Sequence, residues 1–211
     1  MSGMTRVGLL KRSGARGGHQ RCGSAAVVAI ILTALAACGG GKSDAQIASD
    51  ALNAGLRAQA QGRNAEAATD YKNVLAHDPR NKFAYYDLGV IQQTSGDNAS
   101  AEVNYRACLQ IDPNFGPALY NLAIIRTGPS PQEAEELYRH AISLAPNSAA
   151  AHLNLGFLLR SLGRTDEGNA ELRKAVALDP STAQRIPAGT LATPAPATPS
   201  PRSSATPTSR P

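Results

Sequence analysis

The chain has 211 residues, of which 21 are basic and 16 acidic, so its formal net charge is +5. Five of the basic residues and none of the acidic ones lie in the first 37 residues, which leaves 16 of each sign in the rest of the chain. The basic pI of 9.3 therefore comes from one segment and does not indicate a nucleic-acid partner.

The first segment, residues 1–37, is typical of a secretory signal peptide. Its basic residues precede an apolar run over residues 25–37 that is short for a membrane span. The run ends in a motif that resembles the lipobox of bacterial lipoproteins, Leu35-Ala36-Ala37-Cys38-Gly39. The resemblance implies that Cys38 is acylated, with palmitate among the acyl chains, and that residues 1–37 are removed. Two acyl chains would then anchor the protein to the membrane on the extracytoplasmic side of a bacterial cell envelope. The alternative is an uncleaved anchor helix with an unmodified Cys38.

Residues 38–44 are rich in glycine. Gly41-Lys42-Ser43 resembles the end of a phosphate-binding loop, but Ala36 stands where the first glycine of such a loop would be. No strand pattern precedes it either. We therefore predict a flexible tether over residues 38–44 and no nucleotide site.

A helical hairpin is predicted for the stretch from Lys82 to Pro113. Apolar residues recur with helical spacing on both sides of Ser95-Gly96-Asp97, where one helix ends and another begins. The unit recurs, and its closing prolines are 34, 33 and 34 residues apart, at Pro79, Pro113, Pro146 and Pro180. A small residue marks the middle of each first helix, at Gly55, Gly89, Ala123 and Gly156. In each second helix a small residue is followed four positions later by a bulky one, at Ala67 and Tyr71, Ala101 and Tyr105, Ala134 and Tyr138, and Gly168 and Leu172.

This period and pattern resemble the tetratricopeptide repeat. The resemblance implies an all-α fold, a right-handed α-solenoid of four helix-turn-helix repeats over residues 45–181. The repeats are expected at about 48–81, 82–115, 116–148 and 149–182. Their helices are expected near 45–61 and 64–77, 82–95 and 98–111, 116–126 and 131–144, and 149–162 and 165–178.

The resemblance also implies that the first helices line a concave groove that binds a peptide segment of a partner protein. Four residues at one register, two positions before the central small residue, would form a polar ladder for the peptide backbone: Asn53, Asp87, Asn121 and Asn154. Neighbouring groove candidates are Phe83, Tyr86, Val90, Tyr120, Ile124, Leu153, Phe157 and Arg160. The alternative for the ladder residues is a hydrogen bond within the repeat, and the alternative for their neighbours is a place in the core.

Catalytic and metal-binding motifs are not found in the sequence. It has no G-x-S-x-G, H-E-x-x-H or G-x-G-x-x-G pattern, and its histidines lack the spacing of metal ligands. We therefore expect no enzyme activity, cofactor, metal or small-molecule substrate. Cys22 would leave with the signal peptide and Cys38 would be acylated, so Cys108 has no partner for a disulfide. Its position in the repeat favours a small apolar residue, so Cys108 is expected to be a buried free cysteine. His152 is expected to be a packed histidine.

The C-terminal tail, residues 187–211, is rich in Pro, Ala, Thr and Ser and has no aromatic residue, so we predict that it is disordered. It resembles the O-glycosylated stalks of secreted bacterial proteins, with an unmodified spacer as the alternative. Only residues 181–186 remain to cover the last repeat, so Val176 and Leu178 are expected to be partly exposed. Self-association through this end is a further hypothesis.

The sequence thus favours a membrane-anchored scaffold that binds proteins and has no chemistry of its own. The alternative is an assembly factor or noncatalytic subunit of an envelope complex, such as a pilus, secretion or transport machine.

Overall fold

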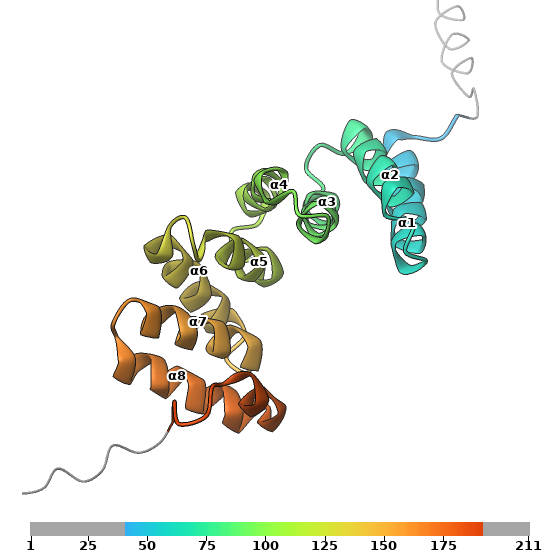
Figure 1. Ribbon diagram of the computed structural model, residues 1–211. Coiled ribbons are helices and arrows are strands. Elements are labelled where there is room, and N and C mark those ends of the chain that lie inside the picture. Colours follow the sequence, from blue (N-terminus) through green and yellow to red (C-terminus); the bar gives the residue numbers. More distant parts are fainter. Residues whose placement is uncertain (1–40, 192–211) are drawn as a thin grey trace, which may run out of the picture. The chain divides into compact units, whose positions relative to one another are not determined.

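The computed structural model describes residues 41–191 of the chain (Figure 1). The predicted signal peptide, Cys38 and most of the predicted tail lie outside the described residues. Within them the chain has no strand and forms α1 (Asp44–Ala60), α2 (Asn64–His77), α3 (Lys82–Thr94), α4 (Asn98–Ile111), α5 (Gly116–Arg126), α6 (Pro131–Leu144), α7 (Ala149–Ser161), α8 (Thr165–Leu178) and the 3-10 helix η1 (Pro180–Arg185). Every α-helix begins and ends within one residue of the bounds expected from the sequence. None of the helices in this range has the length and hydropathy of a membrane span.

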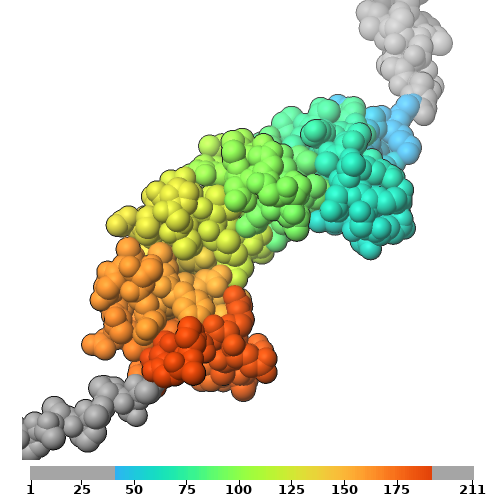
Figure 2. All heavy atoms as spheres, in the orientation of Figure 1, coloured from blue at the N-terminus to red at the C-terminus, as the bar shows by residue number. Residues whose placement is uncertain are grey.

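The helices pair into four hairpins, and each hairpin packs against the next in chain order (Figure 2). The predicted fold class, an α-solenoid of four helical repeats, is confirmed. Three of the turns inside hairpins contain a glycine with positive φ, at Gly62, Gly96 and Gly163. Glycine adopts this conformation without the steric cost that a Cβ would bring, so the helix can end there and the chain can reverse.

The two helices of a hairpin approach closely at the glycine in the middle of the first helix. A Cβ atom at Gly89 would lie 2.6 Å from the Tyr105 ring, and one at Gly55 would lie 2.7 Å from the Tyr71 ring. Non-bonded carbon atoms normally stay about 3.5–4.0 Å apart. Glycine therefore lets a fully buried tyrosine ring lie against the backbone of the first helix.

Side-chain caps fix where several helices begin. Ser43 and Gln46 form a capping box at α1, at the end of the predicted tether. The Oδ1 atom of Asn81 accepts from the Ala84 N–H at 3.1 Å, and Asp97 accepts from the Ser100 N–H at 3.0 Å. These bonds satisfy N–H groups that have no partner within the helix.

Apolar clusters join consecutive hairpins. One such cluster lies between the second and third hairpins and consists of Ala101, Tyr105, Cys108, Ala118 and Leu122. Cys108 is fully buried and free, as expected from the sequence. Burial raises the pKa of its thiol to about 11, so the thiol is protonated and packs as a small apolar group.

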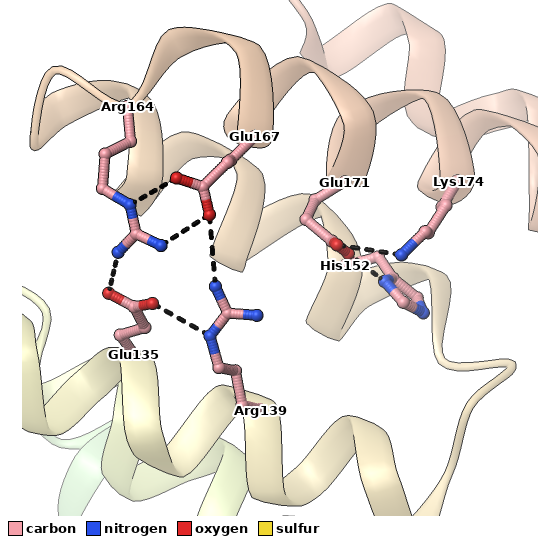
Figure 3. Close-up of polar contacts among 7 residues, drawn as sticks. All are labelled: Glu135, Arg139, His152, Arg164, Glu167, Glu171 and Lys174. Atoms are coloured by element: carbon pink, nitrogen blue, oxygen red, sulfur yellow. Dashed lines mark hydrogen bonds and ion pairs between the residues drawn. The ribbon is translucent and has the colours of Figure 1, made fainter.

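Ion pairs also connect neighbouring hairpins. Figure 3 shows the network between α6 and α8, in which Arg164 Nη1 lies 2.6 Å from Glu135 Oε2 and Arg139 Nε lies 2.9 Å from Glu135 Oε1. Glu167 completes this network by pairing with both arginines. A second network of two arginines and two glutamates joins α4 to the third hairpin and consists of Glu102, Arg106, Arg126 and Glu133.

His152 is buried between α7 and α8, as expected (Figure 3). Its Nδ1 atom is 2.6 Å from Glu171 Oε2, and its Nε2 atom is 3.0 Å from the carbonyl oxygen of Pro146. Each ring nitrogen of His152 therefore has an oxygen partner within hydrogen-bond distance. Burial alone would raise the pKa of Glu171, but hydrogen bonds from His152 and Lys174 outweigh burial and hold that pKa below its usual value.

Residues 180–191 cover part of the open face of the last hairpin. η1 packs against α8 and α7, and beyond it Ile186 and Leu191 pack on a cluster of buried residues, Leu153, Leu172 and Ala175. The sequence assigned residues 187–211 to a disordered tail, and this prediction is wrong at Leu191, which packs on this cluster. Val176 is half-buried and Leu178 is 40 % exposed, as expected.

Candidate peptide-binding groove

The polar ladder predicted from the sequence lies at one register of the four first helices. Asn53 in α1 is exposed, whereas Asp87 in α3, Asn121 in α5 and Asn154 in α7 are half-buried. Because the hairpins stack in chain order, these residues occupy equivalent positions in successive repeats. We call the side of α1, α3, α5 and α7 that carries them the groove face.

Two of the ladder asparagines join their own repeat to the preceding one. Asn121 Nδ2 donates to the Tyr105 hydroxyl at 3.3 Å, and Asn154 Nδ2 donates to the Tyr120 hydroxyl at 3.0 Å. The alternative drawn from the sequence placed such bonds within one repeat, but both bonds run between repeats. Each bond uses one of the two N–H groups of the amide. A role in contacting a peptide backbone stays a prediction for these residues.

Asp87 is the acidic member of the ladder. Burial raises the pKa of its carboxyl group to about 6, because the ionised form loses solvation in this half-buried position. The charge at this point of the groove face therefore changes between about pH 5 and pH 7.

An apolar stripe runs beside the ladder, one position after the central small residue of each first helix. It consists of Leu56, Val90, Ile124 and Phe157. Leu56 is 47 % exposed and Ile124 is 38 % exposed, while Val90 and Phe157 are half-buried. Leu56 was not among the candidates from the sequence, although its register matches that of the other three.

The groove face deepens into a pocket of about 540 Å³ between α5 and α7. Its lining combines apolar and polar groups from Tyr120, Ile124, Thr127, Tyr138, Asn154, Phe157, Leu158, Ser161 and Arg185. The rings of Tyr120 and Tyr138 have their centroids 6.0 Å apart and are inclined at 63°, an edge-to-face arrangement that aromatic pairs favour. Four residues predicted for the groove meet here: Tyr120, Ile124, Asn154 and Phe157.

Comparison with known proteins supports the repeat assignment made from the sequence pattern. Two family models, both described as Tetratricopeptide repeat, match residues 52–114 and residues 130–186. The chain carries tetratricopeptide repeats. No curated protein matches the sequence.

Several solved structures share the fold of these tetratricopeptide repeats. A structure of MamA (residues 41 to the end) from Desulfovibrio magneticus RS-1 is 24 % identical, with a TM-score of 0.59 over 64 % of this chain and 76 % of that chain. The first TPR of Spaghetti (RPAP3), bound to an HSP90 peptide, is 21 % identical, with a TM-score of 0.54 over 57 % of this chain and 97 % of that chain. YrrB, described as a TPR protein with an unusual peptide-binding site, is 17 % identical, with a TM-score of 0.57 over 66 % of this chain and 75 % of that chain. At these identities the likeness concerns the fold.

One predicted groove residue of the fourth tetratricopeptide repeat belongs to the core. Leu153 is fully buried and packs with Leu172 and Ala175, so it cannot contact a peptide, and its prediction as a groove residue is wrong. Its register matches that of Tyr120, but Leu153 belongs to a buried cluster on which Ile186 and Leu191, from the chain beyond the repeats, pack.

Other candidates lie near the groove face but mainly contact neighbouring residues. Arg160 donates to Asn169 in α8 and so faces the second helix of its own hairpin. Phe83 is 47 % exposed at the start of α3, with its ring 5.8 Å from that of Phe115. Tyr86 is half-buried, and its ring lies 5.2 Å from that of Phe115.

Sequence reasoning missed a recurring polar contact inside the tetratricopeptide hairpins. The Tyr71 hydroxyl donates to Gln59 Oε1 at 2.6 Å, and the Tyr105 hydroxyl donates to Gln93 Oε1 at 2.7 Å. In both pairs the glutamine precedes the tyrosine by 12 residues, a spacing that could have been read from the sequence. These bonds fix the position of each tyrosine hydroxyl. The Tyr105 hydroxyl also accepts a hydrogen bond from the ladder residue Asn121.

Proposed function

We propose that this protein is a lipid-anchored scaffold that holds an extended peptide segment of a partner protein along the groove face. The observation that supports the proposal is that two rows of side chains recur on the groove face of successive repeats. One row is the polar ladder of three asparagines and Asp87, and the other is the partly exposed apolar stripe three positions further along each first helix. Leu56 and Ile124 are the exposed members of that stripe.

The chemistry of the groove face suits a peptide. A side-chain amide both donates and accepts, so it can pair with a peptide unit of any sequence. The apolar stripe supplies pockets and ridges for side chains of the peptide, which is how an extended segment gains affinity beyond its backbone. Because the repeats are about 34 residues apart in sequence and stack side by side, a ladder residue and a stripe residue recur at each repeat along the bound segment.

The names of two structural neighbours agree with this proposal. One neighbour holds an HSP90 peptide, and another is described as having a peptide-binding site. A shared fold alone does not transfer a function, so the weight of the proposal rests on the groove face itself.

The anchor is proposed from Cys38 and the motif around it. The expected result of palmitate labelling is that the wild-type chain takes up label and that Cys38→Ser does not. Equal label in both proteins would contradict the anchor and leave the peptide-binding part of the proposal standing.

Affinity capture from detergent-solubilised membranes of the source cells tests the peptide-binding part. We expect the wild-type chain to recover a partner protein that the double variant Leu56→Asp/Ile124→Asp does not recover. Both side chains are partly exposed, so these changes add charge to the groove face with little effect on the core. Val103→Asp is the matched control, because Val103 is 67 % exposed and lies on the second helix α4. Recovery of the same partner by all three proteins would contradict the proposal.

The captured protein would also define the setting of the scaffold. If the captured protein is a component of a pilus, secretion or transport machine, this chain would be an assembly factor or noncatalytic subunit of that machine. Any other partner would indicate a scaffold that does not belong to such a machine.

A further inference from the structure

The pocket between α5 and α7 combines apolar surface with one formal charge. Tyr120, Ile124 and Phe157 supply apolar surface, and Arg185 is the one charged residue that lines the pocket. The lining includes no acidic side chain that would neutralise this arginine. The pocket therefore has the charge that attracts an anionic group.

Arg185 comes from outside the four repeats, on the last turn of η1. The segment that carries it is fixed by its own contacts: the Ser181 N–H donates to Asp179 Oδ1 at 2.9 Å, and Thr182 is buried. Ile186, the next residue, packs on the last apolar cluster. Arg185 itself is exposed, and none of the ion pairs within residues 41–191 involves it. Its position beside the pocket is thus set by the fold, while its guanidinium is open to a ligand.

Hydrogen-bond donors converge on the same pocket. The Tyr120 hydroxyl accepts from Asn154, so its own proton can be given to another acceptor. Burial raises the pKa of Tyr120, and the positive charge of Arg185 opposes part of that rise, so the guanidinium acts on this hydroxyl electrostatically. Arg185, Tyr120 and Asn154 all offer N–H or O–H groups to an acceptor.

We propose that this pocket makes the scaffold selective for an acidic peptide. An apolar side chain of the peptide fills the space over Ile124 and Phe157, and an Asp or Glu carboxylate next to it pairs with Arg185. This inference rests on the proposed function, because it assigns the chemistry of the peptide that the groove face would hold.

The physical reason is the match between a guanidinium and a carboxylate. Both groups are planar, and two parallel N–H···O bonds give such a pair orientation as well as energy. A hydrogen bond to a charged group is stronger than one between neutral groups, and solvent screening at an exposed arginine reduces its contribution. Loss of Arg185 should therefore weaken binding of an acidic peptide by about three- to tenfold.

A selection experiment with random peptides tests the inference and does not require the partner to be identified. A phage library of random nine-residue peptides is selected on the purified full-length chain and, in parallel, on Arg185→Glu. We expect the wild-type chain to enrich peptides with Asp or Glu beside an aromatic or branched apolar residue. Arg185→Glu should enrich Lys or Arg in place of the acidic residue. Because Arg185 is exposed, both proteins should have the same helical circular dichroism.

Binding constants then give the size of the effect. The most enriched wild-type peptide and its Glu→Gln or Asp→Asn counterpart are titrated by fluorescence anisotropy against the wild type, Arg185→Ala and Arg173→Ala. Arg173 is an exposed arginine in α8 that does not line the pocket. The inference predicts that Arg185→Ala and the neutral peptide each lose affinity about three- to tenfold, and that Arg173→Ala leaves it unchanged.

The outcomes separate the inference from the proposed function. Two results would overturn the inference and leave the proposed function intact. In one, the enriched peptides bind through the groove face but show no preference for acidic residues. In the other, Arg185→Glu enriches acidic peptides as the wild type does. Failure to enrich any peptide on either protein would overturn both.

Discussion

Gly89 and Tyr105 are in contact so close that no side chain fits between them, since a Cβ atom at residue 89 would lie 2.6 Å from the ring. Substituting alanine forces the ring or the helix to move. Overpacking of this kind costs about 1–3 kcal/mol, while alanine recovers up to about 1 kcal/mol of helix propensity. We expect Gly89→Ala to lower the free energy of unfolding and the melting temperature measured by circular dichroism.

The control for this prediction is Gly116→Ala at the start of α5, where an added Cβ meets no atom within 4 Å. We expect its melting temperature to stay the same or to rise slightly. If the two variants melted at the same temperature, the contact between Gly89 and Tyr105 would not be a constraint on the fold.

Asp87 makes the stability of the protein depend on pH. The pKa of its carboxyl group is about 6 in the folded chain against 3.8 for an unperturbed Asp, so the folded state binds this proton more tightly than the unfolded state does. The contribution of this group to stability is therefore fully present below about pH 4 and is lost as the pH rises through 6. We expect Asp87→Asn, which cannot ionise, to raise the melting temperature at pH 7.5 and to have little effect at pH 4.

The comparison for this prediction is Asp50→Asn, which changes an exposed carboxylate on α1. It should give no gain at pH 7.5. A gain for Asp87→Asn that is equally large at pH 4 and pH 7.5 would rule out ionisation as its cause.

Glu171 should contribute more to the free energy of unfolding than Glu167. Both glutamates lie on α8, and both accept from basic side chains. The Glu171 side chain is 13 % exposed and pairs with the buried His152, whereas the Glu167 side chain is 54 % exposed. A hydrogen bond to a charged group contributes about 1.5–3 kcal/mol, while exposed ion pairs contribute about 0–1 kcal/mol. We expect Glu171→Gln to lower the free energy of unfolding by about 1–3 kcal/mol.

Glu167→Gln should change the same quantity by less than about 0.5 kcal/mol. Urea unfolding followed by circular dichroism measures both variants. Equal losses for the two would show that burial of the pair between His152 and Glu171 has no energetic effect.

The fold could be predicted closely from the sequence because its determinants are local. The period of about 34 residues, the turn glycines and the pairing of a small with a bulky residue each act within one hairpin. For that reason all eight α-helices of residues 41–191 begin and end within one residue of expectation. Cys108 and His152 are buried, as expected from the sequence.

The groove face could be predicted only in part, because register fixes the side of a helix but not what covers it. Leu153 has the register of Tyr120, yet it lies in a buried cluster on which residues 186 and 191 pack. Asn121 and Asn154 bond to tyrosines of the preceding repeat, contacts that depend on how two hairpins stack. Arg185 enters the pocket from a segment without a repeat pattern, so no sequence period points to it.

Site-specific photocrosslinking tests most directly the claim that the groove face holds the partner. A benzoylphenylalanine is placed at position 124, on the groove face, or at position 103, on α4, and irradiated in intact cells. We predict that position 124 crosslinks to a partner protein and that position 103 does not. Equal crosslinking from both positions, or crosslinking from position 103 alone, would contradict the account.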